Sequence, residues 1–210
     1  MNWEQAINQY INYLKIERSL SENSVLAYQQ DVIKLRQFLE MSNPDRSPVQ
    51  VDEKDLHNFI EYVASIGLSS YSQARILSGL KSFFKYLLYE DMIKTAPTEL
   101  IDGPKLGRKL PDTLSYDEIV KILDVIDLST PEGARNRAII ETLYSCGLRV
   151  SELVDLRINN LYIDSGFIRV VGKGDKERLV PIGRDAGKFI EIYQNEIRVH
   201  LNIKKGNENY

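Results

Sequence analysis

The first residue that could do chemistry is an arginine in a largely apolar run. Arg149 stands in the stretch YSCGLRVSEL, between Leu148 and Val150. A guanidinium is permanently charged, and its planar fork of donors fits two oxygens of a carboxylate or of a phosphate. Two interpretations follow: Arg149 pairs with Glu152 or Asp155 to brace a helix start, or it binds an incoming phosphate. Both hold together if Glu152 fixes the guanidinium from behind.

The second candidate is a lysine between two glycines. The segment GKGDK places Lys173 between Gly172 and Gly174, so its immediate neighbours have no side chains to shield its amine from a substrate. The alternative is an ordinary polar hairpin tip, which commonly carries lysine. The segment does not match a nucleotide-binding P-loop, because that motif needs a longer glycine-rich loop between a strand and a helix.

Cations and hydroxyls also gather in two stretches that contain no acid. One stretch runs from Tyr62 to Tyr89 and is predicted to contain a helix. Four residues at spacings of 3, 4 and 3 share one face of that helix: Arg75, Ser78, Ser82 and Lys85. The other is GPKLGRKLP, with Lys105, Arg108 and Lys109. Such groups commonly contact phosphates, so we expect DNA contacts here, to which the hairpin adds Lys176 and Arg178. The alternative is a solvated polar face, although most such faces mix both signs of charge.

The overall charge gives no support to a basic nucleic-acid-binding domain. The chain of 210 residues has a net charge of −3 and a pI of about 5.6. Residues 1–107 carry 11 Lys and Arg against 14 Asp and Glu, and residues 108–210 carry 16 of each sign. Any attraction for a polyanion must therefore come from the local acid-free stretches.

Other classes of protein and site find no support in the sequence. The single cysteine, Cys146, excludes an internal disulfide framework and suits a reducing compartment. No apolar run is long enough to cross a membrane and the N-terminus does not resemble a secretory signal, so we expect a cytoplasmic protein. His57 and His200 lack metal-ligand spacing, and Ser145 lacks the Gly-x-Ser-x-Gly elbow of a hydrolase. We expect neither a metal nor a cofactor.

Four helices are expected to position the first group of cations. Apolar spacing and capping residues predict helices that begin near Trp3, Ser21, Asp52 and Ser69 or Ser70. With short loops between them, these helices indicate a compact four-helix domain over residues 1–103. Residues 104–112 are rich in proline and glycine and indicate a basic interdomain linker.

Residues 113–210 are expected to combine helices with a small antiparallel sheet, so the fold class is mainly α. Ser115 and Glu118 form a capping box before one helix, and Thr130-Pro131 begins another that should end at Gly147. Ser151 is expected to cap a short helix that contains Glu152. The next expected element is an edge strand at residues 161–163. A hairpin of two strands, residues 167–171 and 178–182, should follow, and a last helix should cover residues 185–201.

The motifs in this order resemble a known family. The segments RNRAIIETLYSCGLRVSELVDLRINNL and GFIRVVGKGDKERLVPI resemble the opening half of the catalytic domain of tyrosine site-specific recombinases, the phage integrase family. The likeness is greatest to the Xer type of chromosome-dimer-resolution recombinase, the XerD group in particular. ARILSGLKSFFKYLLYEDMIKTAP and GPKLGRKLPDTLSYDEI resemble the end of the family's helical, SAM-like core-binding domain and its linker.

The resemblance implies a mechanism and partners. Arg149 would bind a non-bridging oxygen of the scissile phosphate, Lys173 would protonate the departing 5′ oxygen, and Glu152 would orient Arg149. The reaction would be a transesterification through a covalent 3′-phosphotyrosine, with no metal or external energy source. The partners would be double-stranded DNA and further recombinase subunits in a homo- or hetero-tetramer, at the nucleoid, in chromosome partition and cell division.

The family pattern continues with motifs that this sequence does not contain. These are a His-x-x-Arg motif, a second His or Trp, and the tyrosine nucleophile; Tyr210 lacks the motifs that should precede it. We therefore expect residues 113–210 to be the first part of a catalytic domain, in a chain that binds DNA and does not cleave it alone. A mobile-element integrase of the same superfamily and a non-catalytic DNA-binding or partner-binding module are the alternatives.

Overall fold

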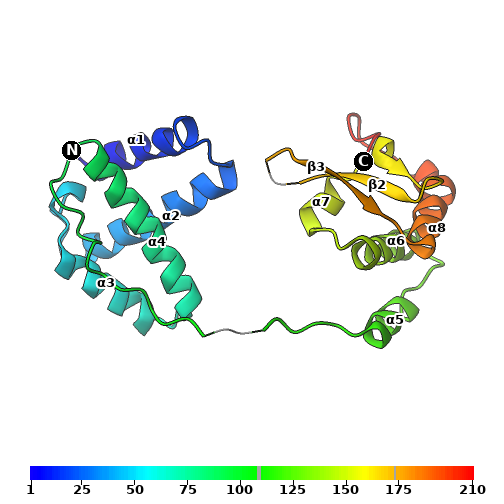
Figure 1. Cartoon of the computed structure of the whole chain (residues 1–210), viewed down its shortest axis with the longest axis horizontal. Coiled ribbons are helices and arrows are strands. Elements are labelled where there is room, and N and C mark those ends of the chain that lie inside the picture. The colour runs from blue at the N-terminus through cyan, green and yellow to red at the C-terminus, as the bar shows by residue number, and fades with distance from the viewer. Residues whose placement is uncertain (108–109, 173) are drawn as a thin grey trace. The chain divides into compact units, whose positions relative to one another are not determined.

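The chain forms two compact units, Met1–Leu110 and Pro111–Tyr210. The computed structural model describes residues 1–107, 110–172 and 174–210, and Figure 1 shows the elements of each unit. The boundary between the units falls inside the segment 104–112 that the sequence predicts to be a linker. Arg108 and Lys109, two of the expected DNA contacts, lie outside the described residues.

The first unit is built from helices α1 (Trp3–Ile16), α2 (Glu22–Ser42), α3 (Glu53–Ser65) and α4 (Ser70–Tyr89), with a short turn η1 (Pro48–Gln50). Helix α2 packs against the other three, and α3 also contacts α4 (Figure 1). Ser21, Asp52 and Ser69 are the N-cap residues of α2, α3 and α4, which confirms the predicted starts. The predicted four-helix domain is therefore present.

The core of this unit lies along α4 and includes one buried polar contact. Tyr10 of α1 is fully buried, and its ring lies edge-on to Phe83, with 5.2 Å between the ring centroids. Its hydroxyl donates to Ser82 Oγ at 2.8 Å, so the buried O–H has a partner inside the protein. Burial raises the pKa of Tyr10 well above its usual value. Ser82 thus serves the packing of α1 on α4.

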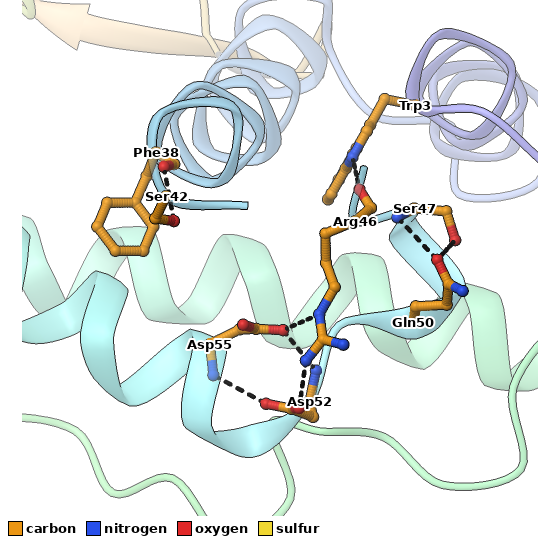
Figure 2. A network of polar contacts seen from close by, with 8 residues as sticks. All are labelled: Trp3, Phe38, Ser42, Arg46, Ser47, Gln50, Asp52 and Asp55. Atoms are coloured by element: carbon orange, nitrogen blue, oxygen red, sulfur yellow. Dashed lines mark hydrogen bonds and ion pairs between the residues drawn. The ribbon is translucent and has the colours of Figure 1, made fainter. Parts of the chain in front are cut away.

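The loop between α2 and α3 is fastened by one arginine (Figure 2). Arg46 Nε donates to Asp55 Oδ2 at 2.7 Å, and its Nη2 donates to Asp52, the N-cap of α3. The backbone carbonyl of Arg46 accepts a hydrogen bond of 2.8 Å from Trp3 Nε1. The Asp55 backbone N–H, followed by Arg46, lowers the pKa of Asp52. One residue therefore ties the starts of α1 and α3 to the loop.

A buried carboxylate joins α2 to α4. Asp31 is buried, and its two oxygens accept hydrogen bonds of 2.9 and 2.6 Å from Nη1 and Nη2 of Arg75. Burial raises the pKa of Asp31, and the hydrogen bonds from Arg75 oppose that effect. Gly79 faces the pair, since a Cβ placed there would overlap Asp31 Oδ2 and lie 2.9 Å from Asp31 Cβ and Cγ. The close approach of the two helices requires a glycine at this position.

The second unit contains the α-helices α5 (Tyr116–Asp124), α6 (Pro131–Cys146), α7 (Val150–Val154) and α8 (Arg184–Ile192). Its antiparallel sheet has the order β1 (Leu161–Tyr162), β2 (Phe167–Val171) and β3 (Glu177–Pro181), with α8 packed on α6 (Figure 1). Ile168 and Val170 of β2 are buried with Cys146 and Leu148 in its core. The mainly helical fold with a small antiparallel sheet is confirmed.

Three predicted boundaries in this unit were wrong. Arg149, and not Ser151, is the N-cap of α7, because Arg149 has the extended backbone and Ser151 lies within the helix. Strand β3 begins one residue earlier than expected, at Glu177, which pairs with Val171. The last helix keeps regular α-helical geometry only to Ile192 and continues as a π-helical turn, η3 (Tyr193–Ile197), and a 3₁₀ turn, η4 (Arg198–His200).

The irregular end of the last helix coincides with a tertiary contact that its periodicity does not contain. Arg198 Nη2 donates to the backbone oxygens of Asn207, Glu208 and Tyr210. The C-terminal segment is thereby held against the helix end. None of the helices in the described part of the chain is long and apolar enough to cross a membrane.

The contact at Gly79 gives the first prediction. In an exposed helix Gly→Ala stabilises by about 1 kcal/mol, whereas here the added methyl group meets the Asp31 carboxylate, so Gly79→Ala should destabilise the first unit by about 1–3 kcal/mol. Trp3 is the only tryptophan and stacks on Phe83, so its fluorescence during urea unfolding reports on this unit.

Gly103→Ala is the control, because the added methyl group would lie at an ordinary 3.7 Å from Leu77 Cδ2. A Gly79→Ala variant as stable as the Gly103→Ala variant would contradict the account of the Asp31 contact.

Candidate functional site

The turn between α6 and α7 presents Arg149 at a corner. Gly147 ends α6 in the left-handed conformation, with φ of 58°, and its N–H donates to the Leu143 carbonyl at 3.0 Å. Two residues later Arg149 has an extended backbone and precedes the first turn of α7. Its side chain is 71% exposed. The local sequence therefore places a cation at a helix start and leaves it accessible to solvent.

Glu152 holds this arginine from the protein side. Its Oε1 accepts a hydrogen bond of 2.8 Å from Arg149 Nη1, and its Oε2 accepts one of 2.9 Å from the Arg149 backbone N–H. The Glu152 side chain is only 3% exposed. The pairing of Arg149 with Glu152 is thus present, while the guanidinium keeps an accessible side. Asp155, the other carboxylate considered from the sequence, is the C-cap residue of α7.

A second arginine meets the same carboxylate from the sheet. Arg178 of β3 donates from Nη1 to Glu152 Oε1 at 2.7 Å and from Nη2 to Oε2 at 2.9 Å. The hydrogen bonds from Arg178, followed by that from the Arg149 backbone, hold the pKa of Glu152 well below its usual range. Glu152 is therefore ionised at every pH at which the protein is expected to work, and it accepts from both arginines.

The sequence did not predict this partner for Arg178, which was expected only as a DNA contact. The two residues are 26 positions apart, so no local spacing joins them. The strand register contains a signal: Arg178 pairs with Val170, and such cross-strand partners share one face of a sheet. Because Val170 is buried, an arginine opposite it should find a partner on the core side.

The hairpin that follows β2 rests on this cluster. A Cβ at Gly172 would lie 3.2 Å from Glu152 Oε1 and 3.3 Å from Arg178 Nη1, so a side chain there would be tightly packed against the pair. The Gly172 N–H donates to the Lys176 carbonyl at 2.8 Å, and Asp175 has a positive φ of 56°. Lys176 is exposed in the turn. Lys173, the predicted proton donor, lies outside the described residues.

The expected DNA contacts of the first unit differ in their surroundings. Arg75 is held by Asp31 and is half exposed, Ser82 accepts from Tyr10, and Ser78 donates to the Ala74 carbonyl at 2.9 Å. Lys85 and Lys105 are exposed. The helix face contains no acid along its own sequence, but packing against α2 brings Asp31 to it. The expectation of an acid-free surface therefore needs correction at Arg75, because a neighbouring helix supplies the carboxylate.

Two further residues considered from the sequence have structural contacts. The Tyr210 hydroxyl accepts a hydrogen bond of 2.8 Å from Arg157 Nη2, and the Arg157 guanidinium lies over its ring at 5.1 Å from the centroid. Ser145 Oγ accepts from the Gly183 N–H at 2.7 Å, at the start of α8. Among the residues that the structure describes, no group of three or more His, Cys, Asp and Glu side chains could hold a metal ion.

Comparisons with known proteins match both units. Residues 7–91 match the family described as phage integrase, N-terminal SAM-like domain, and residues 112–208 match the phage integrase family. The chain is 36% identical to tyrosine recombinase XerD of Listeria innocua, covering 95% of this chain and 67% of that protein. The identity to tyrosine recombinase XerD of Staphylococcus aureus is also 36%, over 96% of this chain and 68% of that protein.

Solved structures share the arrangement of these elements. A lambda integrase tetramer bound to a Holliday junction matches with a TM-score of 0.70 and 20% identity, over 89% of this chain and 53% of that one, which shows the fold alone. XerH site-specific recombinase bound to a palindromic difH substrate matches with a TM-score of 0.63 and 25% identity. That match covers 92% of this chain and 57% of the XerH chain. The chain spans about half to two thirds of the length of these relatives.

The low pKa of Glu152 gives a pH prediction. A carboxylate whose folded-state pKa is below its usual value of about 4.5 stabilises the fold above that pH. This contribution is lost as the pH falls through the folded-state pKa. Glu152→Gln should therefore lower the stability of the second unit at pH 7, and the difference from the unsubstituted protein should shrink as the pH falls below about 4.5.

Denaturant unfolding at several pH values, followed by backbone NMR signals of residues 111–210, measures the difference. Glu177→Gln is the matched control, because Glu177 is 55% exposed and lies 3.5 Å from Arg169. An equal, pH-independent effect of both substitutions would contradict the role of Glu152.

Proposed function

Because the chain belongs to the phage integrase family of tyrosine recombinases, we propose that it serves site-specific DNA recombination of the Xer type. The chain spans about two thirds of its XerD relatives, so this activity is proposed for the protein expressed from its complete gene. The observation that carries the proposal is Arg149, whose guanidinium is anchored on a buried carboxylate while its side chain is 71% exposed. Such a group is preorganised to bind a phosphate.

In the proposed reaction Arg149 stabilises the charge that develops on the scissile phosphate. A tyrosine nucleophile loses its hydroxyl proton to a general base, its oxygen attacks phosphorus, and the bond from phosphorus to the 5′ oxygen breaks. Lys173 donates a proton to that departing oxygen, and a 3′-phosphotyrosine bond forms. The phosphodiester energy is kept in the covalent bond, so no external energy source is needed. Tyr210, which contacts Arg157, is not assigned the nucleophile's role.

Arg149 can meet a phosphate without releasing Glu152. Nη1 and the backbone N–H are bonded to the carboxylate, and Nε and Nη2 make no hydrogen bond to any residue that the structure describes. Those two groups lie along one edge of the guanidinium and can donate to two oxygens. A fixed donor needs little reorganisation when the phosphate arrives, which favours the transition state.

The Xer type is favoured over a mobile-element integrase by the curated relatives, which are named tyrosine recombinase XerD. We propose chromosome dimer resolution as the process, with double-stranded DNA and a second recombinase subunit as partners, in the cytoplasm at the nucleoid. The known structures named above hold a lambda integrase tetramer on a Holliday junction and XerH on a difH substrate. These complexes support the proposed assembly.

We also propose that α4 and the segment after it contact the DNA backbone. Lys85 and Lys105 are exposed, and Arg75 is half exposed with Asp31 behind it. Arg108 and Lys109 belong to the same basic segment of the sequence as Lys105 and are proposed contacts too. Lys176 and Arg178 are the proposed contacts of the hairpin. Because each lost phosphate contact lowers the salt dependence of binding, these contacts can be counted experimentally.

Removal of Lys85 should weaken DNA binding and reduce its salt dependence. Lys85→Ala in the 210-residue chain should lower the slope of log K against log salt by about 0.9, the value for one phosphate contact. Arg75→Ala should be measured in an Asp31→Asn background, because it would otherwise leave a buried carboxylate without its partner. Fluorescence anisotropy with a labelled duplex between low and moderate salt gives both slopes.

Lys54→Ala is the control, since Lys54 is exposed on α3 and was not expected to touch DNA. A Lys85→Ala slope equal to that of Lys54→Ala would remove Lys85 from the interface.

Loss of either proposed catalytic cation should slow strand cleavage. Arg149→Ala should lower the single-turnover rate roughly a hundred- to thousandfold, as for a lost transition-state donor, and Lys173→Ala should slow departure of the 5′ oxygen. The substrate is a duplex that the protein selects from a random-sequence pool, nicked so that the covalent adduct is trapped. The protein is expressed from its complete gene.

Lys188→Ala, an exposed cation on α8, is the control for general loss of charge. If Arg149→Ala forms the adduct at the unsubstituted rate, the recombinase mechanism proposed for this site fails.

A further inference from the structure

We propose that Arg178 is a positioning residue, which acts through Glu152 on Arg149 and on the hairpin that carries Lys173. The inference rests on the proposed recombinase function and assigns Arg178 a role besides the expected DNA contact. It starts from one juxtaposition: a single carboxylate, 3% exposed, accepts hydrogen bonds from Arg149, 71% exposed, and from Arg178, 40% exposed.

The direction of the Arg178 side chain follows from the sheet. Arg178 pairs with Val170 and therefore lies on the face of β3 that is turned to the core of the second unit. Glu152 is 3% exposed and needs a cationic partner, because an unpaired buried charge is costly, whereas the Arg178 side chain is 40% exposed. Both oxygens of Glu152 accept hydrogen bonds from Arg178. The pair joins β3 to α7.

The charges explain why two arginines are useful here. Glu152 paired with Arg149 alone would cancel the positive charge that should attract a phosphate. Arg178 adds a second cation on the same carboxylate, so the cluster of three side chains has a net charge of +1. With each Glu152 oxygen already bonded to Arg178, the carboxylate also has less freedom to turn away from Arg149. Arg178 thus preserves both the charge and the direction of the phosphate-binding group.

The same pair supports the hairpin. The Gly172 backbone passes so close that a Cβ would lie 3.2 Å from Glu152 Oε1 and 3.3 Å from Arg178 Nη1. Gly172 directly precedes Lys173 in the sequence. A substitution of Arg178 should therefore alter the positions of both proposed catalytic cations, Arg149 and Lys173, because Glu152 contacts Arg149 and lies beside Gly172.

A double-mutant cycle tests this role in the protein expressed from its complete gene. The variants are Arg178→Gln, Arg149→Lys and the two combined, and the assay is single-turnover formation of the covalent adduct on the nicked duplex. Arg178→Gln alone should slow cleavage by about tenfold to a hundredfold, the loss expected for charge-assisted hydrogen bonds. In the Arg149→Lys background it should slow cleavage by less than about threefold, because the two changes remove one shared function.

The controls separate positioning from folding and from direct DNA contact. Arg169→Gln is matched, since Arg169 lies on the neighbouring strand, is 41% exposed and pairs with Glu177 instead of Glu152. Arg178→Lys keeps the charge and should restore part of the rate, and urea unfolding of the second unit checks that each variant is folded. If Arg178→Gln does not fold, the same cycle is run with Arg178→Lys.

Three results would overturn the inference. The first is a rate for the Arg178 variant equal to that of Arg169→Gln, and the second is equal losses in both Arg149 backgrounds. The third is a lost rate that saturating protein restores in full together with a lower salt slope, which would make Arg178 a direct phosphate contact alone. If the unsubstituted protein forms no adduct, or Arg149→Lys has no effect, it is the proposed function that fails.

Discussion

The second unit is organised around a carboxylate that cannot be buried alone. Glu152 lies at the start of α7 and is almost fully shielded from water, so its charge has to be matched by donors inside the protein. Arg149 and Arg178 match it from two elements that are distant in the sequence. Glu152 thereby holds together three parts of the unit: the turn between α6 and α7, strand β3, and the hairpin at Gly172. The exposed side of Arg149 is the consequence that matters for a phosphate-binding function.

The first unit also contains a buried carboxylate paired with an arginine, but the pKa of this carboxylate is shifted in the opposite direction. Asp31 of α2 is buried against α4 and accepts hydrogen bonds from Arg75, with Gly79 leaving room for its oxygens. Burial raises the pKa of Asp31, whereas in the second unit the pKa of Glu152 is strongly lowered. For Asp31 the effect of burial exceeds that of the hydrogen bonds from Arg75, whereas for Glu152 the hydrogen bonds from Arg178 and Arg149 exceed the effect of burial.

Local signals predicted the element starts well. Ser115 with Glu118, and Thr130 before Pro131, gave caps that the structure contains, because a cap is made by residues within three or four positions of each other. The left-handed Gly147 was likewise predictable. The cap of α7 was missed although its contact with Glu152 is just as local, because arginine is not among the residues that usually cap a helix. The end of the last helix was missed because Arg198 bonds to the C-terminal segment, a contact that forms only after folding.

The sequence by itself determined the family, the two units, the order of the elements and the identity of Arg149 as the candidate phosphate ligand. Each of these can be predicted from residue types that lie a few positions apart in the sequence. Only the tertiary structure decided which charges meet. Arg75, on a face without acids of its own, pairs with Asp31, and Arg178, expected as a DNA contact, turns to Glu152. Coulombic and hydrogen-bonding partners are chosen by proximity in space, and helix packing and strand register set that proximity between residues far apart in the chain.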